Sequence, residues 1–111
     1  MNRKYLNTIV NVKIDRPLGS KHPKFNFTYP LNYGYIPNTI SGDGEEIDAY
    51  VLGIDKPLQD FTGKVIAIIH RTNDNDDKLV VVKNGTNYTN EEIQNLTKFQ
   101  EQYFNSVIYR K

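Results

Sequence analysis

The chain has 111 residues, enough for one modest domain with a single hydrophobic core. Its 14 lysines and arginines nearly balance 13 aspartates and glutamates, and this net charge of +1 gives no support for bulk electrostatic binding to nucleic acid or an acidic membrane. The chain has no cysteine, which excludes disulfides, zinc–thiolate sites and cysteine nucleophiles.

Apolar and polar residues alternate in a way that predicts five short strands, joined by turns rich in glycine and proline. The second strand places Phe25, Phe27 and Tyr29 on one face, and the fourth is nearly all apolar, as in a central strand. The predicted strands span residues 8–14, 24–29, 47–52, 64–71 and 78–83. Residues 29–39 contain two prolines and a glycine and are predicted to form a turn region.

One helix is predicted after the fifth strand. Thr89 is its expected N-cap, because Glu92 stands three residues later and completes a capping box. Apolar side chains then recur near helical spacing and should pack on the sheet; they are Ile93, Leu96, Phe99, Tyr103 and Val107. The expected fold is mostly β, a small five-stranded closed or partly open, OB-like barrel with one C-terminal α-helix.

The pattern of hydrophobicity gives no sign of export or of a membrane span. The first residues lack the apolar core of a secretion signal, and the longest apolar runs, 65–69 and 79–82, have the length of strands. We therefore expect a cytoplasmic protein with no membrane partner. No linker or repeat interrupts the sequence, so a single domain over residues 1–111 is expected.

Two groups of acidic residues flank the third and fifth predicted strands. The first group is Asp43, Glu45 and Asp48, and the second is Asp74, Asp76 and Asp77. Because like charges repel, such crowding indicates a bound hard cation such as Mg²⁺, which combines a few carboxylates with water and phosphate oxygens. If both strands end at one rim of the barrel, the two groups build a multi-metal site for displacement at phosphorus. Taken alone, each group is more often a solvated loop.

Lys24 and Lys78 are the cations expected beside these acids, since each stands where a loop meets a strand and could balance phosphate charge. A solvated lysine is an equal alternative for both. Tyr29 and Tyr33 offer hydroxyl groups, although tyrosines of a barrel wall are more often core residues with a wet tip. His70 lies in the apolar fourth strand and is expected to be a core residue with a satisfied ring rather than a ligand.

The longest specific pattern runs from Tyr29 to Thr39, Tyr-Pro-Leu-Asn-Tyr-Gly-Tyr-Ile-Pro-Asn-Thr, and is followed at 43–48 by Asp-Gly-Glu-Glu-Ile-Asp. It resembles the soluble, magnesium-dependent inorganic pyrophosphatases of the single-barrel family, with their Tyr-Pro-x-Asn-Tyr-Gly run and Asp-x-Asp-Pro-x-Asp signature. Residues 76–82 are similar to a further family element, Asp-x-Lys-Leu-x-x-Val. The resemblance covers most of the chain, from Val10 to about Tyr103.

This resemblance implies a role for each matching residue, with two or more Mg²⁺ ions as cofactor. Asp43, Glu45 and Asp48 would ligate magnesium, and Glu45 stands where the family places the acid that deprotonates the attacking water. Further metal-binding side chains are implied at Asp76 and at either Asn73 or Asp74. Contacts with phosphate are implied for Lys24, Tyr33, Lys78 and Tyr103. Asp15 matches an outer acid that orders metal-bound water.

The chain also departs from the family pattern at several positions. Glu45 is one methylene longer than the family's aspartate, and a displacement of about 1 Å in a general base costs roughly a hundredfold in rate. Asn26 stands where the family has an acid, and Phe104 where it has a second phosphate-binding lysine. A hairpin that carries a phosphate-binding arginine is missing, and Arg16 or Arg71 are the candidates to replace that arginine.

The leading hypothesis is an inorganic diphosphatase, which hydrolyses pyrophosphate to two phosphates with a metal-activated water. One alternative is a hydrolase of a larger phosphoanhydride or nucleotide, because the missing hairpin opens the pocket. Another is a non-catalytic barrel that binds metal or phosphate. No basic stripe accompanies the aromatic residues, so no nucleic-acid partner is expected, and a homo-oligomer is expected from the resemblance alone.

Overall fold

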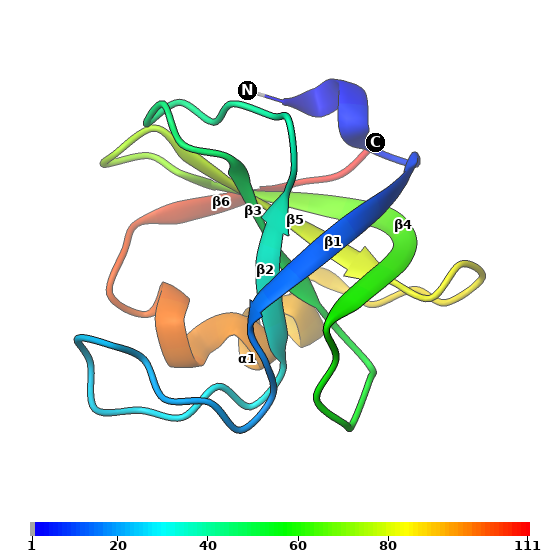
Figure 1. The fold of residues 1–111 in the computed structure, drawn as a ribbon. Coiled ribbons are helices and arrows are strands. Elements are labelled where there is room, and N and C mark those ends of the chain that lie inside the picture. The colour runs from blue at the N-terminus through cyan, green and yellow to red at the C-terminus, as the bar shows by residue number, and fades with distance from the viewer. Residues whose placement is uncertain (1) are drawn as a thin grey trace.

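Five strands close into a mixed barrel in the computed structural model, which describes residues 2–111 (Figure 1). The strand order is β1-β2-β3-β5-β4, and β1 pairs again with β4, which closes the ring. β3 and β5 are parallel, whereas the other neighbouring strands of the ring are antiparallel. The elements are a short 3-10 helix Arg3–Tyr5, β1 Ile9–Arg16, β2 Asn32–Ile36, β3 Ile47–Val51, β4 Asp60–Arg71, β5 Asp76–Val82, α1 Asn90–Glu101 and β6 Ser106–Tyr109. The predicted mostly β barrel with one helix near the C-terminal end is confirmed.

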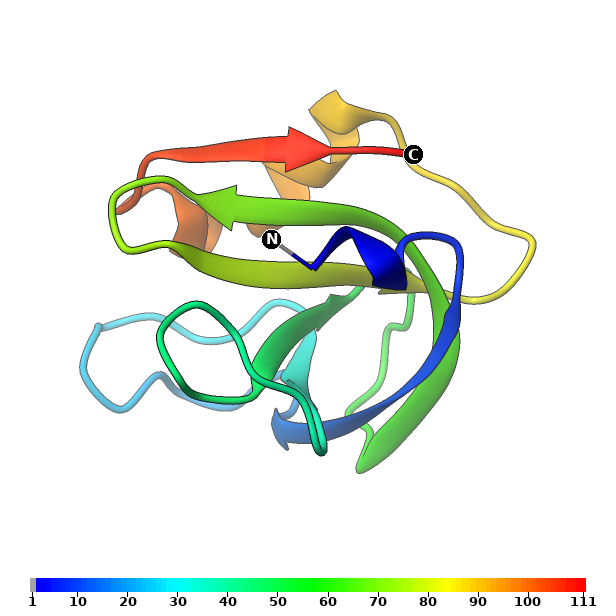
Figure 2. The same ribbon diagram turned by 90° about the horizontal axis from the view of Figure 1, so that it is seen from above.

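The length of β4 allows it to serve three neighbours at once. Its first part pairs with β1, its second part with β5, and the residues from Ile68 to Arg71 also pair with the added strand β6. Figure 2 shows β4 bending between these partners. Gly63 lies where β4 passes from β1 to β5, and a Cβ atom there would lie 2.4 Å from the carbonyl oxygen of Val82. The strand can therefore turn this corner only with glycine at that position.

Apolar side chains form two layers on opposite faces of the barrel wall. Along β3 and β5 they alternate strictly between the layers, as the period of two in a strand requires. One layer fills the barrel and the other lies under α1, so every residue of β5 is buried. The inner layer contains Leu6, Val12, Ile36, Ile47, Ala49, Val51, Val65, Ile68, Leu79 and Val81. The layer under α1 contains Tyr29, Leu31, Tyr33, Tyr50, Leu52, Ile66, Ala67, Ile69, Val80, Val82 and Ile93.

Helix α1 begins at the predicted cap but ends earlier than the predicted apolar stripe. The amide of Glu92 donates to Thr89 Oγ1 at 3.1 Å, and the amide of Thr89 donates to Glu92 Oε1 at 2.8 Å, which confirms the capping box. Leu96 is 42% exposed, Tyr103 follows the helix, and Val107 lies in β6. The prediction that these residues form one buried face of the helix was therefore wrong. Apart from Ile93, the buried residues of α1 are polar, namely Thr97, Gln100 and Glu101. No helix within residues 2–111 is long and apolar enough to cross a membrane.

The predicted strand at residues 24–29 was also wrong. This segment belongs to the loop between β1 and β2, where a single bridge joins Lys21 and Thr28. Its alternating rings pack on aromatic neighbours such as Phe99 of α1 rather than forming a face of a sheet. The second strand is instead β2, inside the predicted turn region, because Gly34 allows β2 to approach β1 closely.

We expect Gly34→Ala to lower the free energy of unfolding by at least about 2 kcal/mol, because overpacking at rigid backbone is costly. The added Cβ would lie 1.9 Å from the carbonyl oxygen of Lys13 and 2.9 Å from Ile14 Cα. Urea denaturation followed by circular dichroism measures the effect. Lys13→Ala is the matched control, since it changes an exposed side chain on the facing strand and should cost less than about 0.5 kcal/mol. Equal midpoints for the two variants would contradict this account of β2.

Candidate active site

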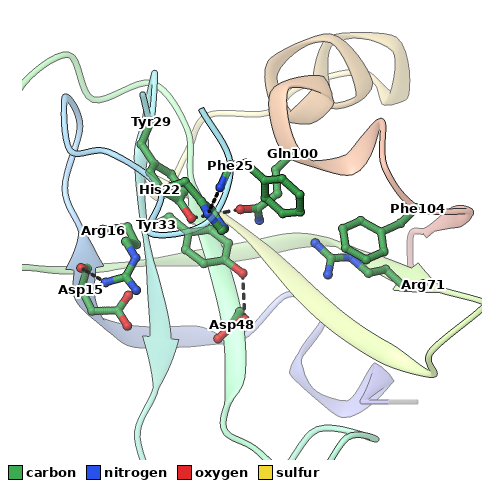
Figure 3. A pocket seen from close by; sticks show the side chains of 10 residues that line it. All are labelled: Asp15, Arg16, His22, Phe25, Tyr29, Tyr33, Asp48, Arg71, Gln100 and Phe104. Atoms are coloured by element: carbon green, nitrogen blue, oxygen red, sulfur yellow. Dashed lines mark hydrogen bonds between the residues drawn. The ribbon is translucent and has the colours of Figure 1, made fainter. Parts of the chain in front are cut away.

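A cavity of about 270 Å³ opens between the barrel wall and the C-terminal end of α1 (Figure 3). Each of the first four strands contributes to its lining, as do the loop before β2 and the residues around the end of α1. The charged and amide side chains are Asp15, Arg16, Asp48, Arg71 and Gln100. The aromatic side chains are His22, Phe25, Tyr29, Tyr33 and Phe104.

A bulge in β1 turns two consecutive charged side chains toward this cavity. The pairing of β1 with β2 shifts register between Ile14 and Arg16, so Asp15 has no partner in β2. Bulges re-aim side chains in this way beside many functional sites. Burial raises the pKa of Asp15, and the neighbouring Arg16 opposes that shift. The structure thus places Asp15, the predicted outer acid, at the wall of the cavity.

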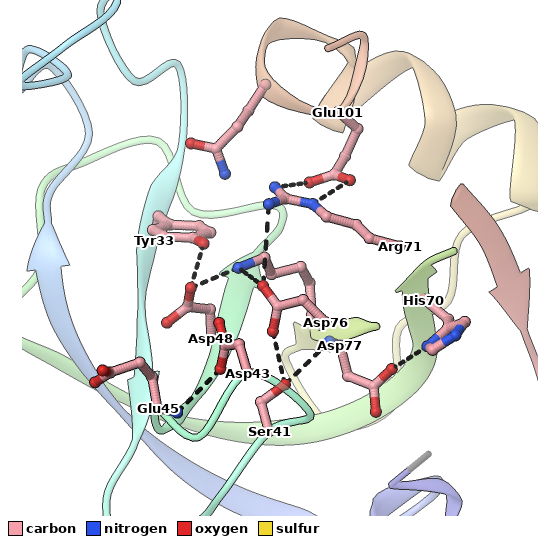
Figure 4. Close-up of polar contacts among 12 residues, drawn as sticks. Tyr33, Ser41, Asp43, Glu45, Asp48, His70, Arg71, Asp76, Asp77 and Glu101 are labelled. Atoms are coloured by element: carbon pink, nitrogen blue, oxygen red, sulfur yellow. Dashed lines mark hydrogen bonds and ion pairs between the residues drawn. The ribbon is translucent and has the colours of Figure 1, made fainter. Parts of the chain in front are cut away.

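Four charged residues form a row next to the cavity because of the strand register (Figure 4). Asp48 of β3 stands opposite Lys78 of β5, and Arg71 of β4 stands opposite Asp76 of β5. Lys78 Nζ lies 2.6 Å from Asp48 Oδ2 and 2.7 Å from Asp76 Oδ2. Two carboxylates from neighbouring strands therefore share one buried ammonium group.

Hydrogen bonds fix the carboxylates of this row. Tyr33 Oη donates to Asp48 Oδ2 at 2.7 Å, and Ser41 Oγ donates to Asp76 Oδ1 at 2.6 Å. Burial and the adjacent Asp48 raise the pKa of Tyr33 well above its ordinary value, so its hydroxyl stays a neutral donor. Burial works to raise the pKa of Asp76, but the Lys78 ammonium and the Ser41 hydroxyl hold it below its ordinary value.

Arg71 is held by a carboxylate from α1. Its Nε donates to Glu101 Oε1 at 3.1 Å and its Nη2 to Glu101 Oε2 at 2.7 Å, a bidentate pair. The ring of Phe104 covers the guanidinium at 3.6 Å, and Tyr50 Oη donates to Glu101 Oε2 at 2.5 Å. The remaining nitrogen, Nη1, lies 4.0 Å from Asp76 Oδ2. One edge of the guanidinium is therefore committed to α1, and the other faces the row.

The structure brings five of the predicted site residues together and leaves five others apart. Those in contact around the row are Tyr33, Asp48, Arg71, Asp76 and Lys78. Those on the exposed surface are Lys24, Asp43, Glu45, Asp74 and Tyr103. Within the exposed set, the amide of Glu45 donates to Asp43 Oδ1 at 3.0 Å, and the Glu45 carboxylate points away from Asp76 (Figure 4).

Sequence reasoning missed Glu101 and Ser41, which carry no motif of their own. A glutamate at the end of a helix and a serine in a loop are ordinary surface residues until the barrel places them beside Arg71 and Asp76. The ring of His70 has a partner, as expected, since its Nδ1 lies 2.6 Å from Asp77 Oδ1, but the residue is half-buried rather than fully in the core.

The donor atoms of the row suit a hard cation. Within residues 2–111, no three His, Cys, Asp or Glu side chains gather closely enough to hold a metal ion by themselves. Asp48 and Asp76 do converge on one positive charge, the Lys78 ammonium. Mg²⁺ is commonly bound by one or two carboxylates together with water and substrate phosphates, so two converging carboxylates meet its needs.

Comparison with known proteins gives one consistent family. The family model described as inorganic pyrophosphatase matches residues 8–109. An inorganic pyrophosphatase of Synechocystis is 36% identical over 75 residues, which cover 52% of this chain and 42% of the relative. One of Nostoc is 49% identical over 39 residues, covering 35% and 21%. The match thus spans less than half the length of these curated relatives.

Solved structures support the same architecture. An inorganic pyrophosphatase of Ehrlichia chaffeensis superimposes with a TM-score of 0.71 at 19% identity, covering 95% of this chain and 87% of that one. Another, of Neisseria gonorrhoeae, gives a TM-score of 0.66 at 24% identity, covering 86% and 73%. At such identities the likeness shows the shared fold.

We expect Glu101→Gln to lower the free energy of unfolding by about 3–5 kcal/mol, because it leaves the Arg71 guanidinium buried without its carboxylate. Thermal and urea denaturation measure the loss. Glu91→Gln is the control on the same helix, where an exposed carboxylate near the N-terminus contributes less than about 1 kcal/mol. If the two variants unfold alike, the Arg71–Glu101 pair does not anchor α1.

Proposed function

Because the chain belongs to the inorganic pyrophosphatase family, we propose that it hydrolyses inorganic pyrophosphate to two phosphates in the presence of Mg²⁺. The observation that carries the proposal is the convergence of Asp48 and Asp76 on one cation beside the cavity, with Tyr33 and Arg71 next to them. This arrangement combines oxygen ligands for a metal with donors for a phosphate group.

Asp48 and Asp76 would hold the metal, together with Asp43 and Glu45 from the loop before β3. Magnesium bound there would lower the pKa of a water molecule and neutralise phosphate charge. Asp15, at the bulge of β1, would order water around it.

The protein's own groups position the substrate and move the proton. Glu45 is exposed and free of the ion pairs of the row, so its carboxylate is available to accept a proton from the attacking water. The Tyr33 hydroxyl, Lys78 and the free edge of Arg71 stabilise the negative charge of the leaving phosphate. For Lys24, Asp74 and Tyr103, which lie on the exposed surface, the proposed contacts rest on the family resemblance alone.

A non-catalytic, anion-binding barrel is the second candidate. The ion pairs favour it, because Lys78 already neutralises much of the charge on Asp48 and Asp76 and the fold is satisfied without a metal. Phosphate release from pyrophosphate separates the two candidates. A cytoplasmic location and a homo-oligomer remain part of the first proposal.

Release of phosphate from pyrophosphate should require Mg²⁺, stop in a chelator, and fall at least about 100-fold in Asp48→Asn, since one ligand and one fixed charge are lost. A colorimetric phosphate assay measures it. Asp60→Asn serves as control, because Asp60 is exposed at the start of β4 and touches no residue of the row. Activity that ignores both the chelator and Asp48→Asn would rule the mechanism out.

Glu45→Asp should keep or raise Mg²⁺-dependent turnover, because the shorter acid is the one that the family signature carries. Glu45 is exposed, so the change leaves the fold intact, and Glu46→Asp is the matched control at the next position. Steady-state kinetics compare kcat for the three proteins. Complete loss of activity in Glu45→Asp alone would show that the pocket is tuned to glutamate.

A further inference from the structure

The cavity beside the row is lined by both charged and aromatic side chains (Figure 3). Asp48 and Arg71 are among the charged ones, and Phe25 and Phe104 are among the aromatic ones, with Phe104 stacked on the Arg71 guanidinium. Inorganic pyrophosphate has no group that would use aromatic rings. Aromatic rings that line a cavity are suited to bind a substrate with an apolar or planar part.

Two of the rings, Phe25 and Tyr103, stack on each other beside the cavity, and this pair forms an aromatic platform. Phe25 and Tyr103 stack with their centroids 5.0 Å apart and their planes inclined by 5°. Phe25 is 42% exposed and Tyr103 is 52% exposed, so both leave much of their surface in water. They come from the loop before β2 and from the turn after α1, segments far apart in the chain. Exposed apolar surface gathered at one place next to a cavity is typical of a binding site.

Contacts within the loop before β2 and with α1 hold the Phe25 side of the platform. His22 Nδ1 accepts hydrogen bonds from the amides of Lys24 and Phe25, both at 3.0 Å, which fixes the turn that carries Phe25. Phe27 then anchors the loop, because its ring lies edge-on to Phe99 of α1 at 5.5 Å. A ring that stacks on a prearranged surface loses little free energy to ordering the protein.

The cations near the cavity are largely committed to carboxylates of the protein. Lys78 is shared by Asp48 and Asp76, and Arg71 is held on two of its nitrogens by Glu101. Arg16, which also lines the cavity, forms no ion pair with a carboxylate within residues 2–111, so it remains available to a phosphate group. A substrate that also stacks on aromatic rings needs fewer such free cations.

We infer that the site takes a nucleoside 5′-diphosphate, with its base on the Phe25–Tyr103 platform and its phosphates against the row, an inference that rests on the proposed hydrolytic function. The oxygen of water forms a bond to the terminal phosphorus, and the bond from that phosphorus to the bridging oxygen breaks. The bridging oxygen leaves with the inner phosphate. The products are the nucleoside monophosphate and inorganic phosphate, and one proton goes to solvent.

The test compares adenosine diphosphate with inorganic pyrophosphate in both binding and hydrolysis. Calorimetry gives Kd for each compound, with and without Mg²⁺, and phosphate release gives kcat/KM. Stacking of one base on an aromatic side chain is worth about 5- to 150-fold in affinity. Phe25→Leu should therefore weaken adenosine diphosphate at least fivefold more than pyrophosphate. Val107→Ala, an exposed apolar residue in β6 away from the cavity, is the control and should change neither compound.

Each outcome separates this inference from the proposed function. Binding of adenosine diphosphate that depends on Phe25 supports the nucleotide site, even if neither compound is hydrolysed. Hydrolysis of pyrophosphate with no binding of adenosine diphosphate overturns the inference and leaves the proposed function standing. An equal effect of Phe25→Leu on both compounds, in a protein that melts like the parent, also overturns it.

Discussion

The parallel pairing of β3 with β5 is the constraint on which the rest of the site depends. It sets Asp48 against Lys78 inside the wall of the barrel, where the ammonium group is almost completely buried. A buried ammonium without a counter-ion is prohibitively costly, so Asp48 and Asp76 are required by the fold before any ligand arrives. Asp48 and Asp76, the acids of the proposed reaction, are thus also needed for the stability of the barrel. Their substitution should lower stability and activity together.

The charges of the site do not cancel completely. Three carboxylates, Asp48, Asp76 and Glu101, face two cations, Lys78 and Arg71, which leaves one negative charge in a poorly solvated place. The row together with Glu101 therefore favours a nearby cation, because the field near buried charges is weakly screened. This charge balance agrees with the divalent cation that the proposed function requires.

Hydrophobic patterns and capping residues were enough to predict those elements whose formation depends on neighbours in the sequence. The apolar runs of β3 and β5 and the Thr89 cap could be read in order along the chain, whereas of the two predicted acidic groups only Asp48 and Asp76 lie in the row. The loop at 24–29 could not be predicted, because its alternation of rings serves contacts with α1 rather than a sheet. β2 was hidden because Gly34 usually signals a turn, whereas here it permits close approach to Lys13. The role of Glu101 could not be predicted either, because its partner Arg71 lies 30 residues away in the sequence.

The docking of α1 and the shape of the cavity depend on the same contacts. The buried polar face of the helix bonds to side chains that line or back the cavity: Tyr29 donates to Gln100, Gln100 donates to Tyr50, and Glu101 holds Arg71. An apolar helix could slide on the barrel at little cost, whereas each of these buried bonds has one partner and one geometry. The helix therefore fixes the direction of Arg71 as well as covering the core. The position of α1 determines which guanidinium edge remains free for a substrate.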